Sequence, residues 1–184
     1  PNQIANNKLG WEKNTQVNAG FDANLWNGLL GINADFYYSR TTDMLFDVPV
    51  SSVSGLTTSN MNIGSMQNKG VEITLTSRKN FGDFSLGLNA NWSLNRNKVL
   101  HLGDEDAPII KESSYVGGYY ITKVGQPVGC YYLLVQDGIF HNQEELDSYP
   151  HFETTTIGDF RFVDADGDGV LDKNKDRVIV GNYM

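Results

Sequence analysis

The chain has 184 residues, of which 40% are hydrophobic, and this composition argues against a generally disordered protein. The formal net charge of −8 argues against nucleic acid as a partner, because phosphate binding needs a basic surface. The single cysteine, Cys130, excludes an internal disulfide framework, and no continuous apolar run is long enough for a transmembrane helix.

Residues 16–39 predict a long β-hairpin with one apolar and one polar face. Apolar and polar residues alternate from Gln16 to Leu25, and the alternation resumes with inverted parity from Leu30 to Ser39. Successive side chains of a strand point to opposite faces, so each strand has one face of each kind. The pair Asn27-Gly28 favours a type I′ turn, which sets Leu25 opposite Leu30. Each strand has about ten residues, the length that crosses a bilayer when tilted.

Residues 41–69 are rich in Ser, Thr, Asn, Gly and Met, show no sustained period, and predict a long loop. Alternation returns from Gly70 to Arg78 and again from Phe84 to Leu94, which predicts two further strands. A four-residue loop over 79–82 keeps their apolar faces together and sets Arg78 opposite Asp83.

The connections alternate in length, with short turns at 27–28 and 79–82 and long segments at 41–69 and after Asn95. This asymmetry is typical of outer-membrane barrels, in which the short turns are periplasmic. The acidic residues of the strands, Asp22, Asp35 and Glu72, all fall on the polar face. A charge at the lipid midplane costs roughly 2–4 kcal/mol, so this sorting supports a membrane wall.

The parity assigns residues to two faces. The predicted lipid-facing residues are Val17, Ala19, Phe21, Ala23, Ile32, Ala34, Phe36, Val71, Ile73, Leu75, Leu86, Leu88, Ala90 and Trp92. The predicted residues facing a wet lumen or a plug are Asn18, Asp22, Asn33, Asp35, Glu72, Thr74, Asn89 and Asn91. Tyr38 and Trp92 fall at the same upper interface, where aromatic girdles lie.

The sequence therefore predicts an all-β fold, an antiparallel transmembrane β-barrel segment of about four membrane strands with long extracellular loops. Residues 1–99 hold these strands and the loop 41–69, with 8 basic and 7 acidic residues. Residues 100–184 hold 6 basic and 15 acidic residues and predict a long acidic extracellular region with a strand pair near 115–123 and 127–136. Four amphipathic strands leave two open edges, so we expect residues 1–184 not to fold alone in water.

An Asp/Gly-rich stretch from Asp164 to Asp176 matches most of a calcium-binding loop of the EF-hand type. Asp164, Asp166 and Asp168 supply oxygen ligands at positions 1, 3 and 5, and Gly169 provides the sharp turn. The Val170 carbonyl and Asp172 follow at positions 7 and 9. Position 12, which needs a carboxylate, is Lys175, and Asp176 arrives one residue late. The alternative is an Asp/Gly turn whose carboxylates cap backbone amides.

Other candidate groups carry less information. Tyr119-Tyr120 and Tyr131-Tyr132, with Phe140, could stack on sugar rings or pack within the protein. His101, His141 and His151 show no paired-ligand spacing and are expected on the surface. The sequence shows none of the catalytic or nucleotide-binding motifs that would indicate an enzyme, so we expect no enzymatic activity.

Several strings in combination resemble the C-terminal barrel half of SusC/RagA-like TonB-dependent outer-membrane receptors of Bacteroidetes-type bacteria. They are WEKNTQVNAGFD, NIGSMQNKGVEITL, VGQPVGCYYLLVQDGIF and GDFRFVDADGDGVLDKNKDRVIVG. The resemblance covers essentially the whole chain in order. It implies a barrel of about 22 strands around a plug, of which this chain is a segment.

The resemblance also implies a function. Such receptors are placed in the outer membrane and import oligosaccharides or peptides, with energy delivered through TonB. It implies a SusD-like lipoprotein partner over the extracellular loops and outer-membrane lipid around the wall. TonB would be contacted by a part of the protein absent from this chain.

Two alternatives stay open at the level of sequence. One is a soluble, calcium-stabilised β-sandwich that binds carbohydrate or mediates adhesion, which would bury Val17, Phe21, Leu86 and Trp92 against a second sheet. The other is a secreted glycan-active enzyme module, which needs a carboxylate pair converging in a cleft.

Overall fold

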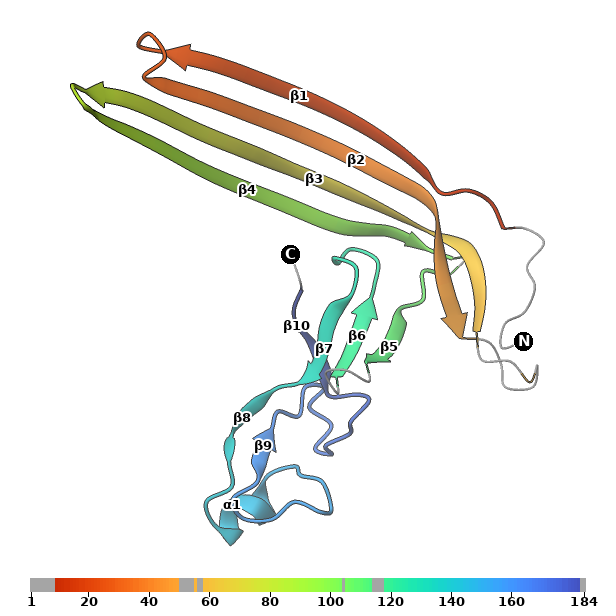
Figure 1. Cartoon of the computed structure of the whole chain (residues 1–184). Helices are drawn as coiled ribbons and strands as arrows, with labels where there is room; N and C mark the ends of the chain where they lie inside the picture. Colours follow the sequence, from red (N-terminus) through yellow and green to blue (C-terminus); the bar gives the residue numbers. More distant parts are fainter. Residues whose placement is uncertain (1–8, 50–54, 56–57, 104, 114–117, 183–184) are drawn as a thin grey trace. The chain divides into compact units, whose positions relative to one another are not determined.

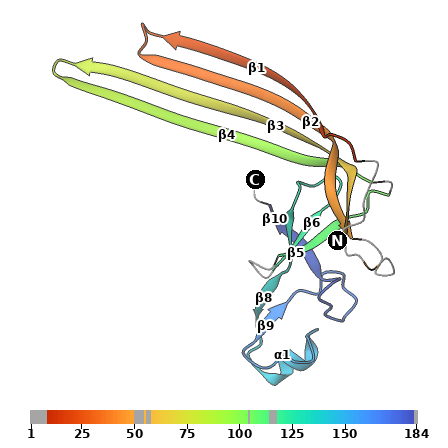
Figure 2. The ribbon, with the colours of Figure 1, turned by 45° about the vertical axis from the view of Figure 1, so that its right-hand side comes forward.

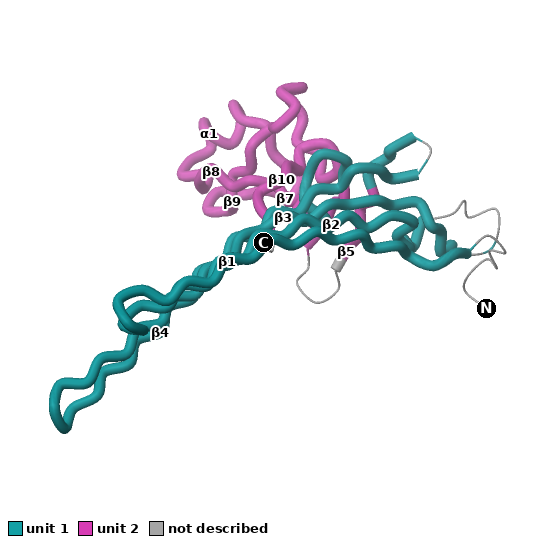
Figure 3. Tube along the Cα trace, turned by 90° about the horizontal axis from the view of Figure 1, so that it is seen from above, with its two compact units in different colours: residues 1–108, 123–128, 184 teal, residues 109–122, 129–183 magenta. Residues whose placement is uncertain are grey.

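The computed structural model describes residues 9–49, 55, 58–103, 105–113 and 118–182. The chain divides into two compact units, coloured separately in Figure 3. The first comprises residues 1–108, 123–128 and 184, and the second comprises residues 109–122 and 129–183. Within the described residues, no helix combines the length and hydropathy that a membrane span requires.

The first unit is built on one antiparallel sheet of four long strands. They are β1 (Lys13–Leu25), β2 (Leu30–Pro49), β3 (Thr58–Phe81) and β4 (Phe84–Leu102). The strands lie side by side in chain order (Figures 1 and 2). The predicted register of the first hairpin is confirmed, since Leu25 pairs with Leu30 and Phe21 with Ala34. The alternation of side chains therefore continues unbroken across β1 and the part of β2 that pairs with it.

The two hairpin turns differ from each other in how well the sequence predicts them. At the first, Asn27 and Gly28 have φ values of 55° and 85°, as a type I′ turn requires. The second was predicted wrongly, because Arg78 pairs with Gly87 and not with Asp83. Gly82, with φ 63°, allows a tight turn, so residues 79–81 continue the ladder as far as the Phe81–Phe84 pair. The observed register of β3 and β4 differs from the predicted one by an even number of residues, so the apolar faces of the two strands still coincide.

The apolar face of this sheet is open to the surroundings. Val17, Phe21 and Trp92 have relative exposures of 64%, 59% and 54%, and Leu86 has 41%. A soluble β-sandwich would bury these four side chains against a second sheet. Their exposure is the arrangement expected of a wall that faces lipid.

The predicted loop at 41–69 is wrong over its described residues, because β2 continues to Pro49 and β3 begins at Thr58. The alternation is hidden by bulges. One extra residue lies in β2 between Thr41 and Met44, where Asp43 has φ 57°, and one lies in β3 between Gly64 and Asn62. A third extra residue lies in β4 between Val99 and His101. Each bulge shifts the period by one residue, so a search for strict alternation fails there.

We call this level, where three adjacent strands carry a bulge, the bulge line. Figure 1 shows β2 and β3 bending at their far ends, beyond the part that runs beside β1. Bulges are frequent at barrel rims, where they bend strands. The predicted domain boundary at residue 99 falls inside β4, which continues past the bulge line to Leu102.

Residues 123–128 are attached to the end of β4 within the first unit. The Val99 amide donates to the Gln126 carbonyl at 2.9 Å, and the Gly125 amide donates to the Val99 carbonyl at 2.9 Å. Asn97 accepts from the Val128 amide at 2.9 Å and donates to Asn68 at 2.6 Å. Val99 is only 1% exposed as a result.

The second unit contains shorter elements. They are β5 (Ile109–Ser113), β6 (Gly118–Thr122), β7 (Cys130–Leu134), β8 (Gln136–Ile139), α1 (Gln143–Ser148), β9 (Phe160–Phe162) and β10 (Arg177–Gly181). Strands β10, β7, β6 and β5 form one sheet in that order, and β8 pairs with β9. Strands β6 and β7 pair within the predicted strand pair near 115–123 and 127–136, of which residues 115–117 lie outside the described residues. Its core contains Ile121, Cys130 and Phe140.

Candidate functional site

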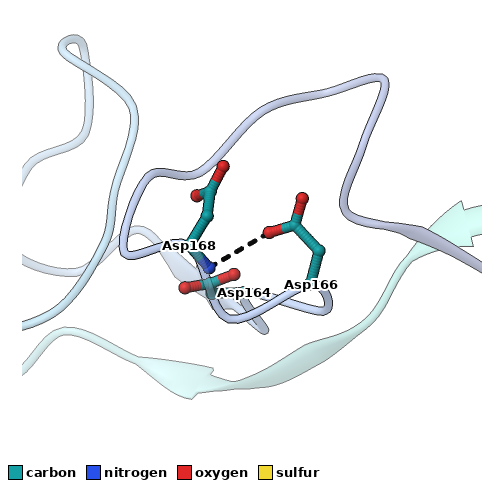
Figure 4. Close-up of side chains that lie close together, drawn as sticks. All are labelled: Asp164, Asp166 and Asp168. Carbon is teal, nitrogen blue, oxygen red and sulfur yellow. Dashed lines mark hydrogen bonds between the residues drawn. The ribbon is translucent and has the colours of Figure 1, made fainter.

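The three aspartates predicted as the first calcium ligands lie together. Oxygen atoms of Asp164, Asp166 and Asp168 all lie within 4.8 Å of one another. Figure 4 shows their side chains grouped on one turn of the loop that precedes β10. Convergent carboxylate oxygens are the ligands that Ca²⁺ prefers.

The same carboxylates also bind backbone amides of the loop. Asp164 accepts from the Gly167 amide at 2.7 Å and from the Gly169 amide at 2.8 Å. Asp166 accepts from the Asp168 amide at 3.2 Å, the contact drawn in Figure 4. The loop thus combines the convergence expected of a cation site with the amide capping expected of an Asp/Gly turn. Calcium binding stays a prediction.

Asp176 has a structural role that is separate from the three convergent carboxylates. It is only 1% exposed. Its carboxylate accepts from the amides of Ala165 at 2.8 Å, Asp166 at 3.4 Å and Asp172 at 2.7 Å. These bonds lower the pKa of Asp176 below its usual value, and the bond from the Asp172 amide has the largest effect. Asp176 therefore joins the start of the loop to its end.

Among the carboxylates of the described residues, Asp172 and Asp176 do not belong to the convergent set. Asp172 uses its carboxylate to accept from the Asn174 amide at 2.6 Å. Coordination by Val170, Asp172 or Asp176 stays a prediction.

Lys175 occupies the position at which a calcium loop has its closing carboxylate. Its ammonium group lies 3.3 Å from Asp168. The hydrogen bond to Asp168, followed by the charges of Asp168 and Asp166, raises the pKa of Lys175. The sequence shows that Lys175 departs from the motif, but only the fold shows that its ammonium group contacts Asp168 of the same loop.

The aromatic residues are partly taken up by packing. Phe140 is 1% exposed, so it offers no surface to a sugar ring. The Arg177 guanidinium lies 3.4 Å from the centre of the Tyr119 ring, a cation–π contact. The rings of Tyr120 and Tyr131 lie next to each other, with their centres 5.3 Å apart and their planes tilted by 41°. These contacts support the packing interpretation for Phe140 and Tyr119.

The histidines lie on the surface, as predicted. His101 lies next to Asp106, with 2.7 Å between its Nδ1 atom and the carboxylate. The His151 ring lies against Phe140, with 6.1 Å between ring centres.

The second unit contains a polar cluster that sequence analysis missed. Arg161 Nε donates to Asp137 at 2.8 Å, and the Tyr149 hydroxyl donates to the same carboxylate at 3.3 Å. The Arg161 guanidinium also lies 5.0 Å from the centre of the Tyr149 ring. Burial, and then Asp137, raise the pKa of Tyr149. No local motif connects residues so far apart in sequence, so only the fold identifies this cluster.

The polar face of the β1–β4 sheet is a further candidate surface, in the first unit. It carries an open depression of about 640 Å³, lined by Gln16, Asn18, Asp35, Phe36, Tyr37, Ser39, Asn68, Glu72 and Asn95. Asp35 and Glu72 lie directly opposite each other on β2 and β3. The depression presents amide groups and carboxylates, which suit polar ligands.

This sheet has an exposed apolar face, a polar opposite face and long strands. Together these features define the chain as part of an outer-membrane β-barrel. The comparison with protein families then identifies it: the family model described as "TonB dependent receptor-like, beta-barrel" matches residues 1–169. The chain belongs to this family. Its proteins are outer-membrane receptors and transporters, not a class of enzymes. The predicted fold class and outer-membrane location are confirmed.

Individual relatives agree with this assignment. TonB-dependent receptor P39 of Formosa agariphila is 29% identical over 100% of this chain and 20% of its own length. TonB-dependent receptor P3 of the same organism is 30% identical over 97% of this chain and 18% of its own length. TonB-dependent receptor SusC of Bacteroides thetaiotaomicron is 27% identical over 91% of this chain and 16% of its own length. The chain therefore spans about a fifth of the length of the relatives it matches.

Solved structures show the same likeness. The RagAB peptide importer in its closed-closed state matches with a TM-score of 0.69 and 26% identity, over 97% of this chain and 18% of that chain. The RagAB peptide transporter matches with a TM-score of 0.65 and 32% identity, over 74% of this chain and 15% of that chain. The resemblance to SusC/RagA-like receptors is confirmed.

Proposed function

We propose that this chain forms part of the wall of a SusC/RagA-type transporter that imports oligosaccharides or peptides across the outer membrane. TonB supplies the energy through a part of the receptor outside these residues. A SusD-like surface lipoprotein is the partner at the extracellular side. The mechanism is binding and gated translocation, without covalent chemistry.

The observation that carries this proposal is the separation of the two faces of the β1–β4 sheet. Val17 and Trp92 lie on the apolar face of this sheet, and both are more than half exposed. The opposite face carries the depression lined by Asn18, Asn68 and Asn95. A wall with lipid on one side and polar groups on the other is what a transport barrel requires.

The chemistry of the polar face supports a polar cargo. Asparagine and glutamine side chains offer both donors and acceptors, which suit the hydroxyl groups of sugars and the amides of peptides equally well. Both cargo classes therefore stay in the proposal. The names of the relatives support an importer, since RagAB is named a peptide importer and SusC a TonB-dependent receptor.

Uptake by cells that carry the full-length receptor tests the proposal. Labelled oligosaccharides and labelled peptides are supplied separately, with and without TonB. We expect uptake of one class, and loss of that uptake without TonB while cargo still binds at the surface. Uptake that continues without TonB would overturn the proposal.

A pair of variants links this test to the structure. Asn18→Trp fills the depression, and Asn91→Trp adds the same bulk to the polar face outside the residues that line it. We expect the first variant to reduce uptake more than the second, with equal amounts of assembled receptor in the membrane. Equal uptake by the two variants would show that the depression is not part of the transport path.

A further inference from the structure

Four basic residues form a cluster on the apolar side of the sheet, directly beyond its apolar rows. We call Arg40, Lys69, Arg96 and Lys98 the outer basic cluster. Lys69 pairs with Tyr38 on β2 and with Arg96 on β4, so these three residues form one row across the sheet. The next row contains Arg40, Gln67 and Lys98. The Tyr38 hydroxyl lies 3.4 Å from the Gln67 amide oxygen, which joins the two rows on the same face.

The row below the cluster is fully apolar. Phe36, Val71 and Leu94 pair across β2, β3 and β4, two residues from Tyr38, Lys69 and Arg96. From Phe84 to Leu94 the lipid-facing residues of β4 extend about 33 Å along the strand, or about 25 Å at a tilt near 40°. This matches the height of the apolar band of outer-membrane barrels. The cluster therefore lies at the edge of the hydrocarbon layer.

The cluster lies at the end of the sheet away from the short turns and directly below the bulge line. Arg40 precedes the β2 bulge at Asp43, and Lys98 precedes the β4 bulge. In outer-membrane barrels the short turns are periplasmic. The outer basic cluster therefore faces the headgroups of the outer leaflet.

No carboxylate of the described residues neutralises these charges. All four side chains are exposed, and none of them makes an ion pair or a side-chain hydrogen bond within the part of the chain that the structure describes. Nearby, Asp43 pairs with Lys13 at 2.9 Å, and Glu12 accepts from the Leu45 amide. Lys69 and Arg96 lie directly opposite each other, and like charges in that arrangement destabilise a sheet.

Below the bulge line, the acidic residues of the same strands lie on the other face, whereas Asp43 and Asp47 of β2 lie at the bulge and beyond it. Asp22, Asp35 and Glu72 all have the polar parity, and the apolar rows carry no acidic residue. Arginine and lysine at such a boundary extend their charged ends into the headgroup region while their stems cover apolar surface. An anionic lipid there would neutralise the charges with its headgroup and cover the apolar rows below them with its acyl chains.

We propose that the outer basic cluster binds the phosphate of an anionic lipid in the outer leaflet, with the acyl chains on the apolar rows. Arginine binds phosphate through its planar fork, and lysine binds it as a point charge. The lipid neutralises the repulsion between Lys69 and Arg96. This inference goes beyond transport and rests only on the orientation of the wall in the membrane.

Binding of a phosphorylated lipid to the purified, delipidated full-length receptor tests the proposal. The probes are lipid A and its dephosphorylated form, titrated in detergent and followed by native mass spectrometry. The variant K69Q/R96Q removes two charges of the cluster. Arg78→Gln is the matched control, because it removes one charge from the polar face of β3, where Arg78 lines a separate depression.

We expect K69Q/R96Q to weaken binding of lipid A by about 25-fold, at about fivefold for each charge removed. Arg78→Gln should bind like the wild type, and Arg96→Lys should keep most of the affinity because it keeps the charge. Heat-modifiable mobility on gels identifies assembled receptor for every variant. Cargo uptake by the same variants reports the transport function separately, so either proposal can fail while the other stands.

Three results would overturn the proposal. The first is equal binding of the phosphorylated and dephosphorylated lipids, which would mean that only acyl chains are recognised. The second is a loss of about fivefold with Arg78→Gln, the same loss per charge, which would mean that overall charge and not the cluster is responsible. The third is displacement of lipid A by inorganic phosphate at comparable concentration, which would indicate a site for a soluble anion.

Discussion

Different interactions fix the positions of residues in the β1–β4 sheet and in the loop from Asp164 to Asp176. In the sheet, each residue is placed by its parity, because one face meets lipid and the other meets polar groups. In the loop, each aspartate is placed by backbone amides, as Asp164 is by Gly167 and Gly169. A sheet of this kind depends on a pattern spread over many residues, whereas the loop depends on a few specific bonds.

The largest expected effect tests the lipid side of the sheet. Ala34→Arg places a charge among the apolar rows, and we expect it to destabilise the assembled full-length receptor by roughly 2–4 kcal/mol if it lies near the midplane. Asn33→Arg places the same charge on the polar face, and should assemble normally. The assembled fraction is measured by heat-modifiable mobility. Equal tolerance at the two positions would show that the faces are assigned wrongly.

A second prediction tests how closely the sheet is packed on its polar face. A Cβ atom on Gly70 would lie 2.5 Å from the Tyr37 ring and 2.6 Å from the Leu94 carbonyl oxygen. Gly70→Ala should therefore cost about 1–3 kcal/mol through overpacking. Gly87→Ala on β4 is the control, since a Cβ there has no atom within 4 Å. Urea unfolding of the receptor in detergent compares the two, and similar midpoints would contradict the prediction.

A third prediction tests the loop through its buried carboxylate. In Asp176→Asn, one of the amides of Ala165, Asp166 and Asp172 faces an NH₂ group in place of an oxygen. We expect a local loss of about 1–3 kcal/mol, measured as faster hydrogen exchange over residues 164–176 in the full-length receptor. Glu144→Gln, at an exposed position on α1, is the control and should leave this exchange unchanged.

The same carboxylate predicts a pH dependence. The pKa of Asp176 is lowered in the folded state, so its contribution is complete above the ordinary carboxyl value of 3.8. The contribution is lost as the pH falls below 3.8 and through the lower folded value. The protection of the loop amides, which is their exchange rate relative to the intrinsic rate at the same pH, should therefore fall below this pH in the wild type and change less in Asp176→Asn. An equal loss of protection in both would assign the effect to other groups.

The smallest expected effect concerns Ca²⁺. Lys175→Glu removes the ammonium group beside Asp168 and places a carboxylate at position 12 of the loop. We expect the affinity of the receptor for Ca²⁺ to rise about tenfold, measured by calorimetry, because ligand charge sets affinity in such loops. Lys173→Glu adds the same charge outside the ligand positions and is the control. No calcium binding in either variant would favour the Asp/Gly turn.

Sequence alone predicts the sheet well where the alternation is strict. The pairing of Leu25 with Leu30 follows from Asn27-Gly28 and parity together, and both signals are local. It fails at Asp43, where a bulge shifts the period, and at Gly82, where a tight turn replaces a longer loop. Both failures come from single residues with positive φ, which composition and periodicity do not register.

Sequence predicts the acidic loop as a motif but not as a structure. The spacing of Asp164, Asp166 and Asp168 was enough to predict that their carboxylates converge. The three amides that hold Asp176, and the return of Lys175 to Asp168, depend on how the backbone turns between them. The cluster of Asp137, Tyr149 and Arg161 likewise depends on the pairing of β8 with β9.

The bulge line has a consequence for how such a receptor can change over evolution. The extra residue in β2 is followed by an extra residue in β3, so the pairing of Leu45 with Asn62 keeps the same register as that of Thr41 with Met66. The hairpin beyond this level can therefore be bent or exchanged without moving a single lipid-facing side chain below it. Variation in the part exposed to the outside is separated, residue by residue, from the part that the membrane constrains.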